Sequence, residues 1–348
     1  MKTSGEDIAK AAGVSVATVS AVFSGLARKR RISRETEQRI REIAKQMNYI
    51  PNSIARSFRK GRTSMVGILL PVPNDNGYTR IVNELETSFF ENGYFASFAF
   101  WQTKDEQRMA AESILSRMPE AVVTVEPQHL KDPLDIPVVT LFNRDPRFDC
   151  ITLDRKAIWL DSMNYLTALG HTRIAAPALQ RRHSGDECDD YSDAADFFLS
   201  EMKRRGLSTA YSNSLIQHLP ENQKHPDLVG EKIAEWLLSF PAEIRPTAII
   251  LDEDTKGAYL IRALARRGFH SPGNISIVSS GNSLLGRATV PAISTFGEGS
   301  EDTLSRKITE RILLRLRTKE EIPPELIHVK YTLIPRESVN PFTGKEWQ

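Results

Sequence analysis

Basic side chains gather near the start of the chain and could bind a polyanion. Residues 1–62 contain 14 Lys/Arg and 5 Asp/Glu, whereas the remaining residues contain 32 and 39. The first segment therefore carries a net charge of +9 and the remainder −7, although the whole chain carries only +2. Such a segment attracts nucleic acid or an anionic membrane surface, and the acidic remainder is repelled by both. The run RKRR at 28–31 is open to two interpretations, phosphate contact or a solvated basic loop.

Three short helices are predicted to position this charge, over 4–13, 15–25 and 33–48. A serine suited to the N-cap precedes each helix, and a glycine ends each of the first two. Two short helices joined by a three-residue turn are the minimum helix-turn-helix. The third helix has an apolar stripe that can close a small core with the other two.

The second helix has small residues on its outward side. At 100° per residue, Ala17 and Ala21 lie nearly opposite the apolar stripe and are flanked by Ser20 and Ser24. One interpretation is an ordinary surface helix of a three-helix bundle. The charge of the segment favours the other interpretation, a helix that faces DNA.

The segments EDIAKAAGVSVATVS and ISRETEQRIREIAKQMNYIPNSIARS resemble the DNA-binding unit of the lactose-repressor (LacI) family of bacterial transcription regulators. In that family the second helix enters the major groove of a palindromic operator, and a hinge helix after the NYxPN sequence enters the minor groove. The resemblance implies that Val16, Ala17 and Ala21 face the bases. It implies phosphate contacts from Ser15, Thr18, Ser20, Ser33, Thr36, Tyr49 and Asn52.

Two features depart from the family pattern. Many members have an arginine where this chain has Ala21, so a bidentate contact to guanine is absent here. The loop at 28–31 is slightly longer than usual, and we expect its Arg30 and Arg31 to contact phosphates.

The segment PNSIARSFRKGR (51–62) is predicted to be the hinge helix. Ile54, Ala55 and Phe58 make one apolar side, and Arg56 is among the basic residues around it. About eight residues form no stable isolated helix, so we expect it to order only on a partner hinge and DNA. A leucine in the family wedges between base pairs at the place that Phe58 holds here. A basic linker with a buried phenylalanine is the alternative.

Beyond residue 62 the pattern changes to buried strands alternating with amphipathic helices. Strands are predicted at 65–70, 94–100, 120–125, 137–142, 173–179, 247–251 and 275–280. Helices are predicted near 79–92, 105–117, 156–169, 189–205, 227–240 and 254–267. This alternation indicates a doubly wound α/β architecture with parallel strands.

The family resemblance extends into this region through IPVV, LTALGHTRIA, PTAIIL and NISIV. It implies two lobes of the periplasmic-binding-protein type (type I) around an effector cleft, with chain crossovers near 155, 290 and 322. The expected organisation is an all-α helix-turn-helix domain (1–48), a hinge helix (49–62) and a two-lobed α/β effector and dimerisation domain (63–340).

The sequence contains no pattern typical of an enzyme or a metal site. GxGxxG after a strand, GxxxxGK[ST], HExxH and GxSxG are all absent. The polar run HSGDECDDYSD (183–193) has no fixed ligand spacing, so a solvated loop is favoured over a metal site. Cys150 and Cys188 lie in no CxxC or Cys/His spacing. We expect no catalytic residues, cofactor or metal.

The expected effector cleft lacks several polar groups that sugar- and purine-responsive family members use. By resemblance, Ser192 stands where an arginine is usual, Glu253–Asp254 replaces an Asn-Asp pair, and Asn282 replaces an acid. Glu253 could instead form a salt bridge across the lobes. For Trp101 and Tyr78, ordinary packing and ligand contact are both open. The full set of expected effector contacts is Asp75, Tyr78, Trp101, Arg144, Asp154, Ser192, Glu253 and Asn282.

These observations predict a cytoplasmic repressor that binds a pseudo-palindromic operator in double-stranded DNA as a homodimer, under control of a small molecule such as a sugar or derivative. A regulator without a small-molecule effector is the alternative. The chain has no apolar run long enough to cross a membrane and no apolar core of a signal peptide at its start. The C-terminus has no leucine heptad, so no tetramerising coiled coil is predicted.

Overall fold

The computed structural model divides the chain into two compact units, residues 1–64 and 65–348. It describes residues 3–49, 62–72, 76–130, 134–176, 190–211, 226–318 and 322–343; the side chains of 76–78, 190–195 and 226 lie outside this description. In the described portion no helix is both long and apolar enough to cross a membrane.

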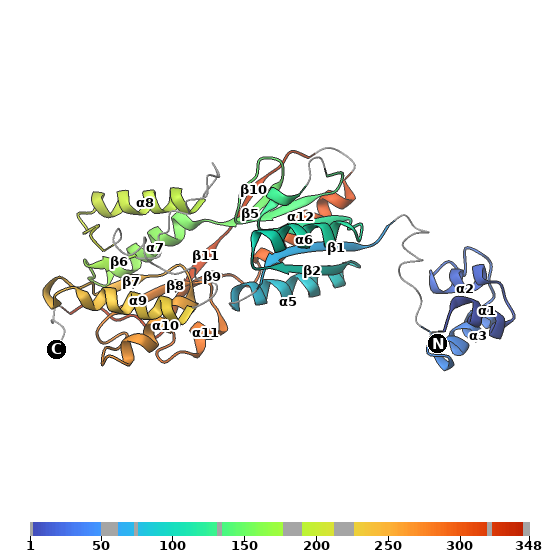
Figure 1. The fold of residues 1–348 in the computed structure, drawn as a ribbon, viewed down its shortest axis with the longest axis horizontal. Coiled ribbons are helices and arrows are strands. Elements are labelled where there is room, and N and C mark those ends of the chain that lie inside the picture. Colours follow the sequence, from blue (N-terminus) through green and yellow to red (C-terminus); the bar gives the residue numbers. More distant parts are fainter. Residues whose placement is uncertain are drawn as a thin grey trace. The chain divides into compact units, whose positions relative to one another are not determined.

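The first unit is a three-helix bundle, α1 (Gly5–Ala12), α2 (Val16–Phe23) and α3 (Arg34–Gln46), as predicted (Figure 1). Its buried core joins residues from all three helices, with Ile8, Val22 and Ile40 fully buried. Gly13 and Gly25 adopt the left-handed backbone with φ of 64° and 73°, which glycine tolerates best. These turns set the angle between helices.

In the second unit, lobe A contains a six-stranded sheet in the order β10-β5-β4-β3-β1-β2, parallel throughout. Its strands are β1 (Met65–Pro71), β2 (Phe95–Trp101), β3 (Ala121–Thr124), β4 (Val138–Leu141), β5 (Asp149–Leu153) and β10 (Leu326–Val329). Its helices are α5 (Asn76–Glu91), α6 (Lys104–Leu115), η1 (Pro127–His129) and α12 (Leu304–Arg317).

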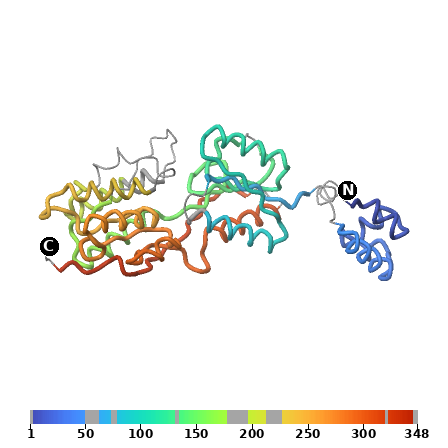
Figure 2. The backbone as a smooth tube through the Cα atoms, turned by 60° about the horizontal axis from the view of Figure 1, so that its bottom comes forward, coloured from blue at the N-terminus to red at the C-terminus, as the bar shows by residue number. Residues whose placement is uncertain are grey.

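Lobe B contains a five-stranded sheet in the order β11-β9-β8-β7-β6, in which only β11 is antiparallel to its neighbour. Its strands are β6 (Ile174–Ala175), β7 (Ala248–Ile250), β8 (Ser276–Ser280), β9 (Ser294–Glu298) and β11 (Tyr331–Ile334). Its helices are α7 (Arg155–Ala168), α8 (Asp190–Arg204), α9 (Pro226–Ser239), η2 (Ala242–Ile244), α10 (Asp254–Ala265) and α11 (Leu284–Ala288). Figure 2 shows the two lobes joined by a few chain segments.

The chain passes between the lobes at three places. It leaves lobe A after β5, returns between β9 and α12, and leaves again at Lys330, between β10 and β11. The first of these places lies next to the expected crossover near 155, whereas the crossovers expected near 290 and 322 are wrong. Residue 290 lies before β9, which belongs to the same sheet as β8. Both of these crossovers lie next to the strands β9, β10 and β11. Because these strands were not predicted from the sequence, the crossovers were placed too early in the chain.

Two other elements that were not predicted, β5 and α12, have charged residues at buried positions. All five residues of β5 are buried, although the strand begins with Asp149. α12 buries Arg311 in addition to its apolar face. The Arg311 Nη2 and Arg315 Nε atoms each lie 2.7 Å from a carboxylate oxygen of Asp149. Burial opposes ionisation of Asp149, but the hydrogen bonds from Arg315 and Arg311 outweigh it and lower its pKa. The acid of β5 and the arginines of α12 therefore neutralise each other inside lobe A.

Candidate nucleic-acid interface and effector pocket

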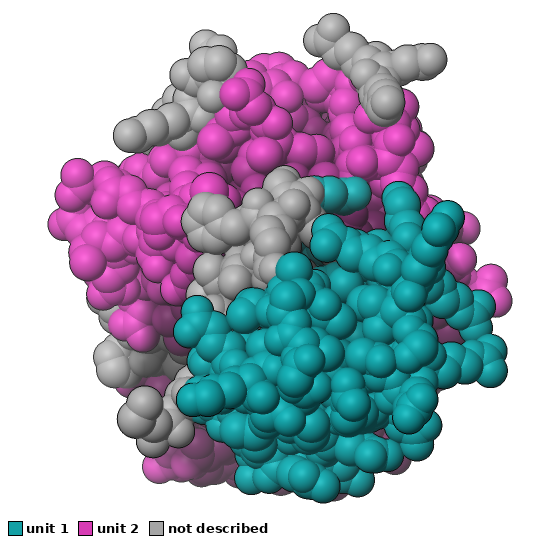
Figure 3. All heavy atoms as spheres, turned by 90° about the vertical axis from the view of Figure 1, so that its right-hand side faces the viewer, with its two compact units in different colours: residues 1–64 teal, residues 65–348 magenta. Residues whose placement is uncertain are grey.

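The first unit, residues 1–64, is drawn in teal in Figure 3, and its second helix begins with a pair of hydroxyl side chains, Ser15 and Thr18. Ser15 is the N-cap of α2, and its Oγ accepts a 3.1 Å hydrogen bond from the Thr18 backbone N–H. The hydroxyl oxygens of these two residues are 2.9 Å apart. The cap leaves Val16, which is 47% exposed, and Ala17 on the outward side of the first turn.

The third helix begins in the same way. Ser33 is the N-cap of α3; its Oγ accepts from the Thr36 backbone N–H at 3.1 Å and donates to the Thr36 hydroxyl at 2.8 Å. The free backbone N–H groups of a helix N-terminus and its dipole favour anions such as phosphate. Two such termini, each with a serine and a threonine hydroxyl, can therefore position a phosphate backbone.

Ala21 lies inside the unit, so the prediction that it faces the bases is wrong. Its side chain is only 3% exposed. The helix ends just beyond it, and the chain turns back at Gly25, where the Leu26 backbone N–H donates to the Ala21 carbonyl at 2.9 Å. Position 21 is therefore next to the start of the basic loop.

The remaining expected DNA contacts differ in how far they are exposed. Arg30 and Arg31 are exposed, and Arg31 has a left-handed backbone with φ of 54°. Ser20 is half-buried. The Tyr49 ring packs on Phe23 with a centroid distance of 5.5 Å, so its phenol is held by the core of the unit. The hinge residues Asn52, Ala55, Arg56 and Phe58 lie outside the described residues.

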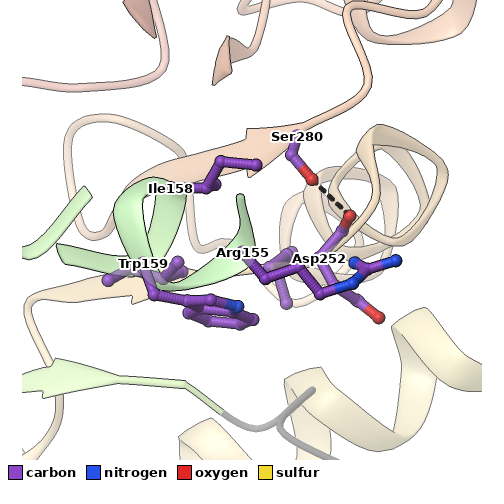
Figure 4. Close-up of a pocket in the computed structure, with 7 residues that line it drawn as sticks. Arg155, Ile158, Trp159, Asp252 and Ser280 are labelled. Atoms are coloured by element: carbon purple, nitrogen blue, oxygen red, sulfur yellow. Dashed lines mark hydrogen bonds between the residues drawn. The ribbon is translucent and has the colours of Figure 1, made fainter. Parts of the chain in front are cut away.

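A pocket lined by described residues lies in lobe B, where the strands β7 and β8 end (Figure 4). It is lined by Arg155, Ile158, Trp159, Ile250, Leu251, Asp252 and Ser280. The carboxyl ends of parallel strands are the usual ligand-binding edge of an open α/β sheet. Its guanidinium, indole, hydroxyl and carboxylate groups could orient a small polar molecule with an apolar face.

One acid of this pocket is already neutralised. Both oxygens of Asp252 lie 2.7 Å from the Lys256 Nζ, and Ser280 Oγ donates to the Asp252 carbonyl. The Lys256 side chain is only 4% exposed, so the pair is shielded from water. Arg155 is the cationic side chain of the pocket lining. Sequence reasoning did not single out Arg155, Asp252 or Ser280, although each closely follows or ends a buried strand.

Several predicted effector contacts have other partners. Trp101 is 6% exposed and packs with Ile114 and Val122 in the core of lobe A, which favours ordinary packing of the two roles left open for it. Asn282 Oδ1 accepts from Arg336 Nη2 at 2.6 Å. Asp154 is the N-cap of α7 and accepts from the Ala157 backbone N–H at 3.0 Å.

The structure also describes two other expected effector contacts, Arg144 and Glu253. Arg144 is exposed and Glu253 is half-buried at the N-cap of α10. Asp75 lies outside the described residues, and of Tyr78 and Ser192 only the backbones, in α5 and α8, are described.

Asp254, the neighbour of Glu253, joins the strands β8 and β9 and the N-cap of α11. Its carboxylate accepts from Ser279 Oγ, from Thr295 Oγ1 at 2.7 Å and from the Ser283 backbone N–H at 2.6 Å. Burial raises the pKa of Asp254, and the three hydrogen bonds oppose that effect. A carboxylate enclosed in this way supports the shape of the pocket edge rather than contacting a ligand.

Metal ligation finds no support in the described part of the chain, where no group of three or more His, Cys, Asp and Glu side chains converges. Most of the polar run 183–193 lies outside that part.

Comparison with known proteins assigns both units. Residues 6–52 match the model of bacterial regulatory proteins of the lacI family, and residues 163–339 match the periplasmic binding protein-like domain. The chain is 24% identical over 341 residues to the catabolite repressor/activator of Escherichia coli K12, covering 95% of this chain and 97% of that protein. It is 25% identical over 338 residues to the ribose operon repressor of the same organism, covering 90% and 95%.

Solved structures share the fold over nearly the whole chain. The Lac repressor bound to ONPG in the repressed state gives a TM-score of 0.77 at 16% identity, covering 97% of this chain and all of that one. The CelR–cellobiose complex gives 0.65 at 19% identity, with 97% and 100% covered. With its helix-turn-helix unit, its two α/β lobes and these matches, the chain belongs to the lacI family of bacterial regulatory proteins.

Proposed function

We propose that the protein is a cytoplasmic transcription repressor that binds a pseudo-palindromic DNA operator as a homodimer. The observation that carries this proposal is the arrangement of α2 and α3. Both helices begin with an exposed Ser hydroxyl cap, and α2 presents Val16 and Ala17 on its first turn. This geometry suits a helix whose N-terminal turn lies in the major groove while the caps hold phosphates.

The first turn of α2 offers methyl groups and few hydrogen-bond donors to the bases. Val16 and Ala17 can contact thymine methyls, but they cannot form the bidentate hydrogen bonds that give most direct discrimination. Sequence selection then depends on the spacing of two half-sites and on the deformability of the centre of the operator. The wedge proposed for Phe58 in the hinge 49–62 would act at that centre.

A second copy of the chain is the proposed occupant of an apolar surface on lobe A. Phe90, near the end of α5, and Phe95 and Phe100, on the edge strand β2, are 68%, 57% and 39% exposed. The rings of Phe90 and Phe95 contact each other with a centroid distance of 6.4 Å. Neighbouring exposed aromatic rings on an edge strand indicate an interface. The related Lac repressor structure is described as a dimer bound to operator, which supports a dimer here.

The dimer is tested by sedimentation of the full chain. We expect the wild-type protein to sediment as a dimer and Phe95→Glu to sediment as a monomer, since a charge would be buried in the contact. A Phe95→Glu protein that remains a dimer would show that the interface lies elsewhere.

The proposed effector is a small polar molecule in the pocket at the ends of β7 and β8. Related structures hold cellobiose or ribose, which favours a sugar or derivative. The changed residues Glu253 and Asn282 keep the alternative open, a regulator without a small-molecule effector.

Thermal unfolding with a panel of sugars, sugar acids and sugar phosphates separates these two alternatives. A ligand present at about 100 times its Kd stabilises the folded chain by about 2.7 kcal/mol and raises the Tm. A raised Tm in wild type that Arg155→Met abolishes would identify the pocket. An unchanged Tm across the panel would support regulation without a small molecule.

Operator binding itself is tested by selecting bound sequences from a random DNA library with the full chain. We expect two half-sites related by a two-fold axis. Recovery of no preferred sequence, with binding abolished by moderate salt, would reduce the protein to a non-specific DNA binder.

A further inference from the structure

Two of the three connections between the lobes meet at Glu298 and Tyr331. Glu298 is the last residue of β9, and Tyr331 is the first residue of β11, where the two strands pair. From Glu298 the chain continues into lobe A, and one residue before Tyr331 it returns from lobe A. Figure 1 places β9 and β11 at the side of lobe B nearest lobe A. A contact at this point is therefore sensitive to the arrangement of the lobes.

An arginine from lobe A reaches this point. Arg80, on α5, places Nη2 3.1 Å from Glu298 Oε1, and the Tyr331 hydroxyl donates to the same oxygen at 3.2 Å. The Glu298 side chain is 1% exposed and that of Arg80 is 28% exposed. Burial raises the pKa of Glu298, and the positive charge of Arg80 opposes the rise.

The positive charge that compensates the buried Glu298 carboxylate comes mainly from Arg80 of lobe A. Glu298 Oε2 is buried and accepts no hydrogen bond from the residues that the structure describes. Tyr331 donates one neutral hydrogen bond, and the backbone N–H of Leu304 also lowers the pKa of Glu298. Glu84, on the same helix as Arg80, adds a negative charge nearby. A lobe movement that withdraws Arg80 would leave a buried charge without its cation, which is strongly unfavourable.

We propose that the Arg80–Glu298 pair is an interlobe latch that stabilises the lobe arrangement seen here against other arrangements. The latch is more than local packing because its two members belong to different lobes and meet beside two crossovers. Its effect on DNA binding rests on the proposed function, in which the lobe arrangement controls the DNA-binding unit.

Hydrogen exchange of the full chain without DNA tests the latch. The variants are Glu298→Gln and Arg80→Met, with Glu84→Gln as the matched control. Glu84 Oε1 lies 4.0 Å from Arg80 Nη1 and is more exposed, so its loss should leave the latch closed. We expect amides at 299–303 and at 330 to exchange at least ~5-fold faster in the two latch variants, the lower end of typical coupling effects. Amides of β3 and β7 inside each lobe should exchange as in wild type.

Equal exchange at the crossovers in Glu298→Gln, Glu84→Gln and wild type would overturn the proposal. If Glu298→Gln fails to fold, Arg80→Met decides the question, because it removes the cation from the more exposed of the two side chains. Faster exchange at the crossovers in Arg80→Met supports the latch, and unchanged exchange refutes it.

The link to regulation is measured separately by gel shift on the selected DNA site. A latch variant should change the affinity at least ~5-fold, whereas Glu84→Gln should not. Faster crossover exchange in a protein that binds no DNA would keep the latch and refute the proposed function. Normal DNA binding with unchanged exchange at the crossovers would keep the proposed function and refute the latch.

Discussion

The backbone N–H of Leu26 donates a 2.9 Å hydrogen bond to the carbonyl of Ala21 and so begins the basic loop directly beside the end of the helix α2. Ala21 is buried, although the helical repeat alone places it on the outward side with Ala17. The usable recognition surface of α2 is therefore its first turn, with Val16 and Ala17, and the loop that follows the helix.

Enlarging Ala21 should destabilise the first unit. We expect Ala21→Leu to lower the free energy of unfolding of this unit by about 1–3 kcal/mol, because a buried site has no room for three more carbons. Ala17→Leu is the matched control on the exposed side of the same helix and should change that free energy by less than about 0.5 kcal/mol. Hydrogen exchange of the α3 amides in the full chain measures both. Equal protection in the two variants would place Ala21 at the surface.

The charge of the α2 cap should affect DNA binding without affecting the helix. Asp and Asn are both good N-caps, so Ser15→Asp and Ser15→Asn should each retain α2. Only Ser15→Asp adds a negative charge near the expected phosphate, and two charges 4 Å apart in water interact by about 1 kcal/mol, or about fivefold in affinity. Gel shifts at low salt compare the two variants. Equal affinities would remove Ser15 from the phosphate-binding surface.

The basic loop should add affinity for all DNA sequences. We expect Arg30→Gln with Arg31→Gln to weaken binding to specific and random DNA alike. The slope of log K against log salt should fall by about 1 for each phosphate that the variant no longer neutralises. Lys203→Gln, at an exposed position on α8 of the other unit, is the control for the same removal of positive charge. Weaker binding confined to the specific site would instead assign the loop a role in reading bases.

Acid should weaken lobe B through His171. Its Nδ1 lies 2.9 Å from Thr247 Oγ1 and its Nε2 lies 3.0 Å from the Asn340 carbonyl oxygen. Burial lowers the pKa of His171, opposed by the bond to Asn340, so between the lower folded and higher unfolded pKa values the unfolded chain binds more protons. The stability contributed by neutral His171 is present above about pH 6.5 and is lost as the pH falls toward the folded pKa.

We therefore expect the Tm to fall between pH 7.5 and pH 5, and to fall less in His171→Gln than in wild type. His270→Gln, at an exposed histidine of the same lobe, is the control and should retain the wild-type dependence. An identical pH dependence in all three proteins would assign the acid sensitivity to other groups.

Local chemistry explains what could be predicted from the sequence. The serine caps and the glycines at 13 and 25 act within a few residues, so the bounds of α1, α2 and α3 were predicted to within about two residues. The strands β1, β3, β4, β7 and β8 were also predicted, because a strand buried on both faces is a continuous apolar run. The edge strand β2 was predicted as well, because it is almost entirely apolar although it is only partly buried.

The sequence by itself therefore determined the helix-turn-helix, the α/β class and the family. Only the tertiary structure decided which polar groups are buried and with what partners. Asp149 opens a buried strand because Arg311 and Arg315, more than 160 residues away, neutralise it. Glu298 meets Arg80 across two lobes, and Ala21 is covered by a turn that reverses the chain. Burial of a charge or a methyl depends on residues brought close by folding, which periodicity along the chain cannot specify.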